Sequence, residues 1–353
     1  MVAHGVETIH SYKRGGRKFA SASCSVPGVQ NHALACKFPY SSRAPKTFSR
    51  SENPHPTQHK KNAYSSCIIC IGNAGGGIDR EDSIMGEEVK MTKTPSTQHH
   101  FVLVHGISHG AWCWYKIRVL LENSGHKVSC LDLAGAGIDR SDADAVLSFD
   151  DYDKPLVDFM SALPEGEKVI LVGHSAGGLS VAHTCHEFPN KIELAIYVGA
   201  TMLRSGFCCD QDIHDGVPDL SDFGDVYDLG FGLGPDKPPT SALIRKEFQR
   251  MILSEFSPVE DSTLGSMLLR PGPVMAIQSA RFEGGNDQIN QIKRVYIRTT
   301  HDRVVKPEQQ DAMIKRWAPS EVWTLESDHS PFFSTPNELF GFLIKALTYT
   351  HCD

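Results

Sequence analysis

A serine at position 175 lies in the stretch GHSAG, residues 173–177, with a glycine two residues before it and another two residues after it. A run of four apolar residues, 169–172, precedes this stretch. A serine on a sharp turn between a strand and a helix can be exposed as a nucleophile, because small neighbours let the backbone turn tightly. The same pattern also suits a turn without chemistry. A nucleophile therefore requires a base, an acid and an oxyanion site elsewhere in the chain.

Asp302 and His329 are the candidate acid and base for Ser175. Asp302 follows the predicted strand RVYIRTT, residues 294–300, and His329 follows the predicted strand EVWTLES, residues 321–327. The order Ser, Asp, His along the chain is the order found in α/β-hydrolases. His329 would take the serine proton and later return it to the leaving alcohol, and Asp302 would hold the imidazole in the required tautomer. Asp132, which also follows a predicted strand, is the competing acid.

The candidate oxyanion donors are two backbone N–H groups. One belongs to Ala176, directly after the serine, and the other to Ile107 in the loop sequence HGISHGAWCW, residues 105–114. In α/β-hydrolases one donor follows the nucleophile and the second comes from a loop after an earlier strand. Glycines in this loop let its backbone face a pocket.

Several further side chains are placed by their neighbours in the sequence. We expect His109 and Phe207 to line the substrate pocket. His105 and His174 adjoin glycines inside turns, so we interpret them as residues for packing and hydrogen bonding rather than as bases.

No metal or organic cofactor is expected. His183 and His186 lie three residues apart on a predicted helix, but no HExxH pattern or carboxylate set accompanies them. Cys67 and Cys70 have the CxxC spacing without a second pair, so a zinc or redox site is not predicted there.

Strands and helices alternate along most of the chain. We expect strands at 101–106, 126–133, 168–173, 192–200, 294–300 and 321–327, and helices at 112–122, 150–163, 176–188, 308–317 and 337–348. This alternation predicts an α/β fold with a doubly wound, mostly parallel sheet and right-handed crossovers. The three candidate catalytic residues each follow a strand, so they would project from one edge of the sheet.

Residues 204–285 interrupt the alternation. This insertion is too long for a bare loop, and we interpret it as a helical cap over the carboxyl edge of the sheet. One amphipathic helix is predicted in it, from the helical spacing of Ile244, Phe248, Met251, Ile252 and Phe256.

The first 78 residues differ from the rest in charge. They contain ten Lys or Arg residues, two acidic residues and ten serines, whereas the whole chain of 353 residues has a formal charge of −7. A basic, serine-rich, acid-poor segment is typical of a transit peptide, here to the chloroplast; a disordered basic tail on a cytoplasmic protein, or a start at Met85, is the alternative. We expect a linker at 79–98 and one hydrolase domain at 99–353.

The bulk properties restrict the partners. The net negative charge argues against a nucleic-acid binder, and no apolar run approaches the roughly 20 residues that span a membrane. The expected partners are a small ester and water. The oligomeric state is left open by the sequence, and a homodimer is compatible with it.

Four stretches carry a specific resemblance to a known family. HFVLVHGISHGAWCWYK, VGHSAGGL, VYIRTTHDRVVKPEQQ and SDHSPFFSTPNEL resemble the plant methylesterases, the salicylic-acid-binding-type esterases of the α/β-hydrolase superfamily. The resemblance runs from about residue 100 to residue 348, and the basic extension resembles the branch targeted to chloroplasts. It implies a capped α/β-hydrolase fold and cleavage of methyl esters of small, hormone-like acids. It also gives the nucleophile, acid, base and oxyanion donors the positions assigned above.

Two positions depart from relatives in this family. The related hydroxynitrile lyases carry a lysine directly after the catalytic histidine, where this chain has Ser330, and this disfavours lyase activity. Ile107 stands where many methylesterases have a small residue, so its side chain is expected to narrow the acyl pocket.

The expected function is a carboxylic ester hydrolase, most simply a methylesterase that works through an acyl-serine. A lyase or acyltransferase on the same triad, or a non-hydrolytic receptor for a small acid, is the alternative. The acyl group is open among indole acetate, jasmonate, salicylate and chlorophyll-derived acids, and the family analogy favours an auxin-like ester.

Overall fold

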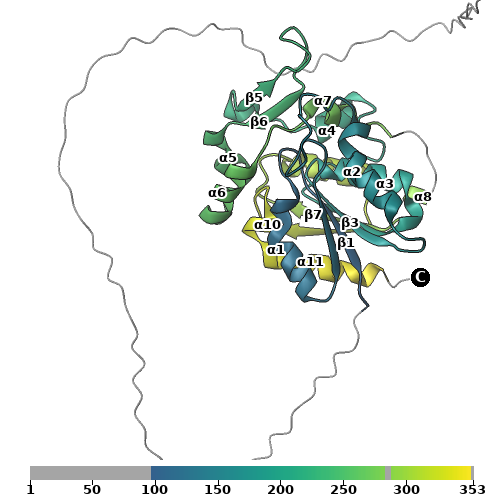
Figure 1. The fold of residues 1–353 in the computed structure, drawn as a ribbon. Coiled ribbons are helices and arrows are strands. Elements are labelled where there is room, and N and C mark those ends of the chain that lie inside the picture. The colour runs from purple at the N-terminus through teal and green to yellow at the C-terminus, as the bar shows by residue number, and fades with distance from the viewer. Residues whose placement is uncertain (1–96, 283–287, 351–353) are drawn as a thin grey trace, which may run out of the picture. The chain divides into compact units, whose positions relative to one another are not determined.

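The computed structural model describes residues 97–282 and 288–350 (Figure 1). The predicted transit peptide at 1–78, the linker up to residue 96, and the CxxC pair at Cys67 and Cys70 lie outside the described residues. The expectations for these segments therefore stay predictions.

Six parallel strands form one sheet, in the order β2-β1-β3-β4-β7-β8. Their bounds are β1 His100–Val104, β2 Lys127–Leu131, β3 Val169–His174, β4 Ile192–Val198, β7 Arg294–Thr299 and β8 Glu321–Leu325. Each strand begins and ends within two residues of the predicted range. The doubly wound parallel sheet expected from the sequence is confirmed.

Helices cover both faces of this sheet. Of the described helices outside the cap that are longer than five residues, a pair packs in the hydrophobic core on one face and a group of three in the core on the other. The first pair is α1 Tyr115–Asn123 and α11 Pro336–Ala346, and the second group is α2 Phe149–Ala162, α3 Gly177–Glu187 and α9 Pro307–Arg316. Two short helices complete this part, a 3-10 helix at Ala111–Trp114 and α10 Pro331–Ser334.

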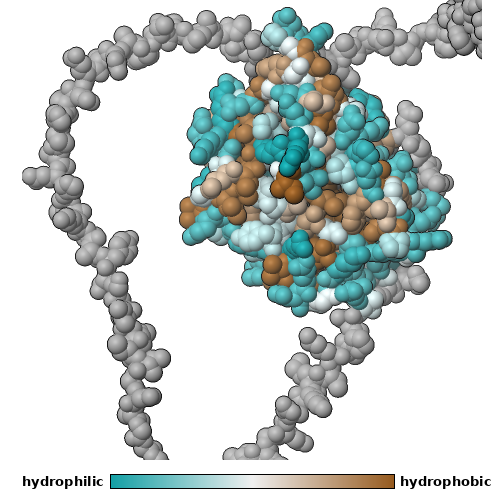
Figure 2. Space-filling model, in the orientation of Figure 1, coloured by the Kyte–Doolittle hydropathy of each residue, from teal (hydrophilic) through white to brown (hydrophobic). Residues whose placement is uncertain are grey.

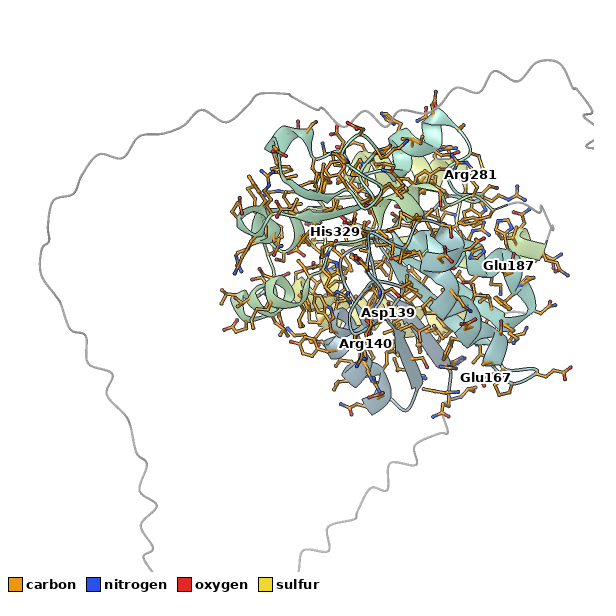
Figure 3. The ribbon with its side chains drawn as sticks, turned by 45° about the horizontal axis from the view of Figure 1, so that its top comes forward. Asp139, Arg140, Glu167, Glu187, Arg281 and His329 are labelled. Atoms are coloured by element: carbon orange, nitrogen blue, oxygen red, sulfur yellow. The ribbon has the colours of Figure 1, made fainter. Side chains whose placement is uncertain are left out.

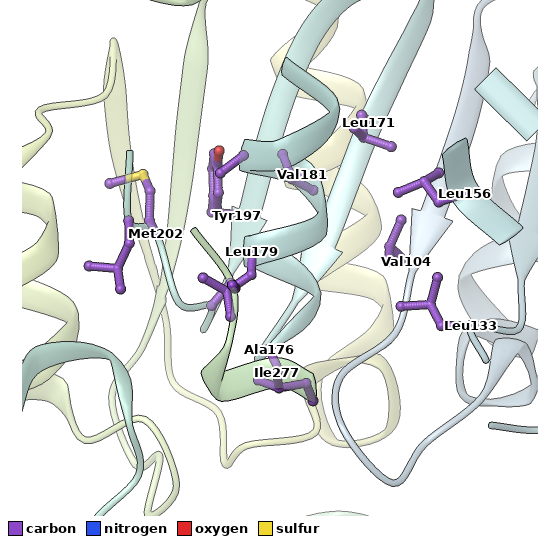
Figure 4. Close-up of a cluster of buried hydrophobic side chains, with 14 of the residues drawn as sticks. Val104, Leu133, Leu156, Leu171, Ala176, Leu179, Val181, Tyr197, Met202 and Ile277 are labelled. Atoms are coloured by element: carbon purple, nitrogen blue, oxygen red, sulfur yellow. The ribbon is translucent and has the colours of Figure 1, made fainter. Parts of the chain in front are cut away.

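The central strands β1, β3 and β4 are mostly apolar because both of their faces are buried, whereas the edge strands β2 and β8 are partly exposed. In β1, Phe101 and Leu103 belong to the core on the side of α1 and α11, whereas Val102 and Val104 belong to the core on the opposite side. Figure 4 shows Val104, Leu171 and Tyr197 of three neighbouring strands in this second core. Such packing fixes the strands and therefore the positions of the loops that follow them.

The cap inserted between β4 and β7 lies beyond the carboxyl ends of the strands (Figure 1). Its elements are α4 Asp210–Gly216, β5 Tyr227–Gly230, β6 Ser241–Ile244, α5 Lys246–Leu253, α6 Val259–Leu268 and α7 Val274–Gln278. The short helix α8 Gln288–Gln291 follows the cap and leads into the amino end of β7. Strands β5 and β6 form an antiparallel pair, which the sequence analysis did not predict.

The amphipathic helix predicted through Ile244 and Phe256 is shorter than expected. Ile244 pairs with Tyr227 in the β5–β6 sheet, so it belongs to a strand. Phe256 lies beyond Leu253, the last residue of α5. The apolar spacing was helical across both boundaries, but the pairing of β6 with β5 determines where the helix begins.

Within residues 97–282 and 288–350, no helix has the length and apolar character to cross a membrane.

Candidate active site

Ser175 occupies a strained turn between β3 and α3. Its φ is +53°, in the left-handed region that non-glycine residues rarely adopt, and it is 3% exposed. The flanking glycines are required by close packing: a Cβ on Gly173 would lie 2.7 Å from the carbonyl oxygen of Gly177, and a Cβ on Gly177 would lie 2.5 Å from that of His105. The turn thus has the geometry that presents a nucleophilic serine.

The structure brings Asp302 and His329 together. Asp302 follows β7 and His329 follows β8, and Nδ1 of His329 lies 2.9 Å from each oxygen of the Asp302 carboxylate. A carboxylate only accepts, so Nδ1 carries the proton and Nε2 is left unprotonated as a base. Figure 3 shows His329 beneath the cap, far from Glu167 at the other end of the strands.

The carboxylate of Asp302 is also fixed by its own loop. It accepts hydrogen bonds from the Thr299 hydroxyl at 2.9 Å and from the backbone N–H groups of Val304 and Val305 at 2.8 and 2.9 Å. With His329 included, both carboxylate oxygens are fully engaged, so the acid can hold the imidazole in one orientation.

The remaining link of the candidate triad joins Ser175 to His329. Among the described residues, neither Ser175 Oγ nor Nε2 of His329 has a hydrogen-bond partner, and neither atom is sealed from solvent. Catalytic hydrogen bonds are often long before substrate binds and shorten in the complex. The Ser175–His329 bond therefore stays a prediction.

The backbone N–H groups of Ile107 and Ala176 are available as oxyanion donors. Within the described part of the chain neither N–H has an acceptor. Gly106 lets the Ile107 loop approach the nucleophile, because a Cβ on Gly106 would lie 2.7 Å from Cβ of Ser175. Two unpaired donors beside the serine are what an oxyanion hole requires.

The Ile107 side chain packs against the cap. A Cβ on Gly272 would lie 2.2 Å from Cγ1 of Ile107, so the isoleucine rests directly on the Gly272 backbone. The next residue, Ser108, accepts a hydrogen bond from Arg270 N–H at 3.1 Å through its carbonyl. The cap segment around residues 270–272 therefore sets the position of the Ile107 loop.

The side chain of His109 holds the Ile107 loop through a hydrogen bond and a ring contact. Its Nδ1–H donates to the Ile107 carbonyl at 3.1 Å, and its ring stacks on Trp112 with centroids 5.5 Å apart. Burial lowers the pKa of His109 to about 3, so the ring stays neutral. Phe207 is 3% exposed and lies with Leu203 in the core. Contact of either His109 or Phe207 with substrate stays a prediction.

Asp132, the competing acid, has a different task. Its two oxygens accept from the backbone N–H groups of Ala111 at 2.6 Å and Ile138 at 3.2 Å. His105, interpreted from sequence as a hydrogen-bonding residue, accepts the Leu133 N–H at its Nε2 at 3.1 Å. Both side chains thus fix loops at the carboxyl edge of the sheet.

The sequence analysis did not predict that the two residues that flank the base bind the cap. The buried carboxylate of Asp328 accepts from the backbone of Phe256 and Ser257 in the cap, and the hydroxyl of Ser330 donates to the carbonyl of Leu253 at 2.7 Å. Only the polar pattern Asp-His-Ser in the sequence indicated that this loop had partners. The hydroxyl of Ser330, at the position where the lyases carry a lysine, is thus hydrogen-bonded to the cap.

Comparison with known proteins agrees with this geometry. Residues 101–341 match the alpha/beta hydrolase family. Methylesterase 17 of Arabidopsis thaliana is 55% identical over 262 residues, which are 73% of this chain and 94% of that relative. The chain belongs to the plant methylesterases of the α/β-hydrolase family. Pheophorbidase of Raphanus sativus is 43% identical over 71% of this chain and 94% of its own.

Solved structures place the chain in the same family. The crystal structure of methylesterase MES16 from Arabidopsis has a TM-score of 0.64 and 42% identity, and the match covers 71% of this chain and 99% of that chain. Membership of the methylesterases makes this chain an enzyme of the serine esterase type.

Proposed function

We propose that this methylesterase-family protein hydrolyses methyl esters of small carboxylic acids through an acyl-serine intermediate. The observation that carries the proposal is the Asp302–His329 pair at 2.9 Å, on the same edge of the sheet as the strained turn of Ser175. The similarity to methylesterases supports a methyl ester as the substrate class.

In the acylation step, Ser175 Oγ attacks the ester carbonyl carbon while Nε2 of His329 accepts the hydroxyl proton. The carbonyl oxygen becomes an oxyanion that accepts hydrogen bonds from the N–H groups of Ile107 and Ala176. Each such donor contributes roughly 10²- to 10³-fold to the rate. The bond to the methoxy group then breaks, and His329 passes its proton to this oxygen, so methanol leaves.

In the deacylation step, water replaces methanol. His329 takes a proton from the water as it attacks the acyl carbon, and it returns the proton to Ser175 when the free acid leaves. The carboxylate of Asp302 stabilises the imidazolium in both steps. These steps use only the side chains and backbone of this chain, the ester and water.

Replacement of Ser175 by Ala tests the nucleophile. We expect turnover of p-nitrophenyl acetate by the full chain to fall by roughly four to six orders of magnitude. Ser161→Ala, which changes an exposed serine of α2, is the matched control and should retain full activity. Retained turnover in the Ser175 variant would refute the assignment.

A panel of methyl esters tests the substrate class. Release of methanol from the methyl esters of indole acetate, jasmonate, salicylate and chlorophyll-derived acids would be measured with the full chain. Tight binding of the free acids without turnover of any ester would instead indicate a receptor. Cyanohydrins and alcohol acceptors, added separately, would reveal lyase or acyltransferase activity.

We further propose that the protein forms a homodimer through the cap. The burial pattern of helix α6 is opposite to that of a typical amphipathic helix. Its buried residues are two polar residues and a glycine, namely Asp261, Ser262 and Gly265. Its exposed apolar side chains are Val259, Leu264, Met267 and Leu268. Figure 2 shows apolar surface gathered over α5 and α6, at the left of the view. A contiguous apolar patch of this kind is typical of a surface covered by a partner.

Light scattering during size exclusion tests the dimer. Met267 is 75% exposed, and Met267→Asp should shift the mass from a dimer to a monomer. Val322→Asp, at another exposed apolar position on β8, should not shift it. A monomeric full-length protein would contradict the proposal.

We propose that residues 1–78 direct the protein to chloroplasts. The support is their composition of ten basic residues, two acidic residues and ten serines. Residues 1–85 fused to a fluorescent reporter should give a chloroplast signal, and a fusion with the ten basic residues changed to Gln should lose it. A diffuse cytosolic signal from the unchanged fusion would contradict the proposal.

A further inference from the structure

The connection between α5 and α6 touches both loops that carry the acid and the base. We call residues 251–257, which are the end of α5 and the first residues after it, the α5–α6 turn. The two residues that flank Asp302 in the sequence contact this turn, and so do the two residues that flank His329. These four flanking residues are His301, Arg303, Asp328 and Ser330.

Asp328 makes the densest of these contacts. It is 2% exposed, and its Oδ2 accepts from the backbone N–H groups of Phe256 and Ser257 at 2.9 and 3.0 Å and from the Ser257 hydroxyl at 3.0 Å. Its Oδ1 accepts the Ser330 N–H at 2.9 Å. A buried carboxylate with four donors is held in one orientation, so the turn and the base loop are held to each other.

The other flanking residues extend the contact. Ser330 donates its hydroxyl to the Leu253 carbonyl at 2.7 Å. Arg303 donates to the Met251 carbonyl at 3.0 Å and pairs with Glu255 at 2.6 Å. His301 and Phe256 meet edge to face, with ring centroids 5.0 Å apart.

The position of β8 explains why the base loop needs this support. Among the residues that the structure describes, β8 is the last strand in the sheet order and pairs with β7 alone, so no further described strand lies beside its carboxyl end. The loop after β8 carries His329, whose ring must stay aligned with Asp302. The α5–α6 turn therefore gives this loop the packing that a neighbouring strand would otherwise supply.

We propose that Asp328 is a positioning residue, which clamps the α5–α6 turn of the cap to the loop of His329 and so aligns the base. This inference rests on the proposed ester hydrolysis. In this proposal the α5–α6 turn stays attached to the loop of His329 and does not open as a lid.

Asp328→Asn tests the clamp, because both oxygens of Asp328 accept hydrogen bonds. The amide NH₂ would therefore face either the N–H donors of Phe256 and Ser257 or the N–H of Ser330. We expect kcat for p-nitrophenyl acetate to fall about 10- to 100-fold with KM within about 3-fold of the original protein, since misplacement of a catalytic group by about 1 Å costs on this order. Hydrogen exchange of the Phe256 and Ser257 amides should accelerate.

Asp261→Asn is the matched control. Asp261 is a buried cap carboxylate on α6, 4% exposed, which accepts from the Tyr115 hydroxyl and pairs with Lys116 on α1. Among the described residues, its side-chain bonds run to α1 and not to the loops of the acid and base. Asp261→Asn should keep kcat within about 3-fold of the original protein, although it removes the charge of a cap carboxylate that is buried to a similar extent as Asp328.

A spectroscopic measurement separates this inference from the proposed function. The Nδ1–H proton of His329, bonded to the Asp302 carboxylate, should give a far-downfield proton NMR signal. The signal should weaken or move in Asp328→Asn and persist in Asp261→Asn. This readout needs no turnover, so it tests the clamp even if the original protein hydrolyses no ester.

Two outcomes would overturn the clamp. One is a folded Asp328→Asn protein whose kcat and downfield signal match those of Asp261→Asn. The other applies if Asp328→Asn does not fold: Ser257→Ala, which removes only the hydroxyl donor, should then lower kcat a few-fold and speed exchange of the Ser257 amide. Unchanged kcat and exchange in that variant would equally reject it.

Discussion

His174 is in direct contact with His329: its Nε2–H donates to the His329 carbonyl at 2.7 Å, and the two ring centroids lie 4.6 Å apart. Since His174 directly precedes Ser175, this bond ties the nucleophile turn to the loop of the base. Burial, and then the nearby His329, lower the pKa of His174 well below its usual value, so the ring stays neutral. It therefore adds no second positive charge when His329 accepts a proton.

Replacement of His174 by Phe should keep the ring packing and remove the donor. The His329 carbonyl would then be buried without a partner, which costs about 1–3 kcal/mol in the free energy of unfolding. We expect a loss of this size in urea denaturation, together with a lower kcat. His174→Gln, which keeps an N–H donor, should recover part of both. Equal stability of the Phe variant and the original protein would contradict the support role.

Asp302→Asn should lower kcat about 10⁴-fold with little change in KM. The amide NH₂ would donate to Nδ1 of His329, which forces the proton onto Nε2 and removes the base. Asp311→Asn, which alters a 57% exposed partner of Arg298 on the surface, should stay close to the original activity. Steady-state kinetics on p-nitrophenyl acetate make the comparison. A fall of less than tenfold would argue against Asp302 as the acid.

The sheet and the order of the catalytic candidates were predictable because their signals are local. Strands such as β3 and β4 are buried on both faces, so β3 begins with the apolar run VILV and β4 is apolar except for Glu193. The turn at Ser175 also has a local signal, since its two glycines are dictated by backbone contacts. Strand ends that share one edge then place Asp302 near His329.

The cap was less predictable because its boundaries depend on distant partners. Ile244 has helical spacing with Phe248, yet it pairs with Tyr227 in a strand. The amide of Phe256 is bound by Asp328, 72 positions further along the chain. The hydrophobic periodicity of a sequence does not indicate a hydrogen bond between residues this far apart. The role of Asp328 becomes visible only once the fold brings the cap to the base loop.

Gly272→Ala should disturb the oxyanion loop from the cap side. The new methyl group would lie 2.2 Å from Cγ1 of Ile107, so the Ile107 loop must shift. We expect kcat to fall by about 10²-fold, the order of losing one oxyanion donor. Gly341→Ala on α11, where a Cβ meets no atom of the described residues within 4 Å, is the matched control and should leave kcat unchanged. Equal kcat in the two variants would show that the cap does not position Ile107.

Acid should destabilise the protein partly through His109. Burial lowers its folded pKa to about 3 from 6.5, so below about pH 6.5 the unfolded chain binds a proton that the folded chain does not. The contribution of His109 to the free energy of unfolding is therefore constant above about pH 6.5. Between about pH 6.5 and about pH 3 it falls by about 1.4 kcal/mol per pH unit.

Denaturant unfolding of the original protein and His109→Phe at pH 7 and pH 5 measures this contribution. The variant loses the hydrogen bond to Ile107 at both pH values, so only the difference between the two pH values reports the titration. That difference should be smaller by about 2 kcal/mol in His109→Phe. His214→Phe, at a side chain that is 80% exposed, should keep the pH dependence of the original protein. If His109→Phe keeps it as well, His109 is not the buried neutral group that the structure describes.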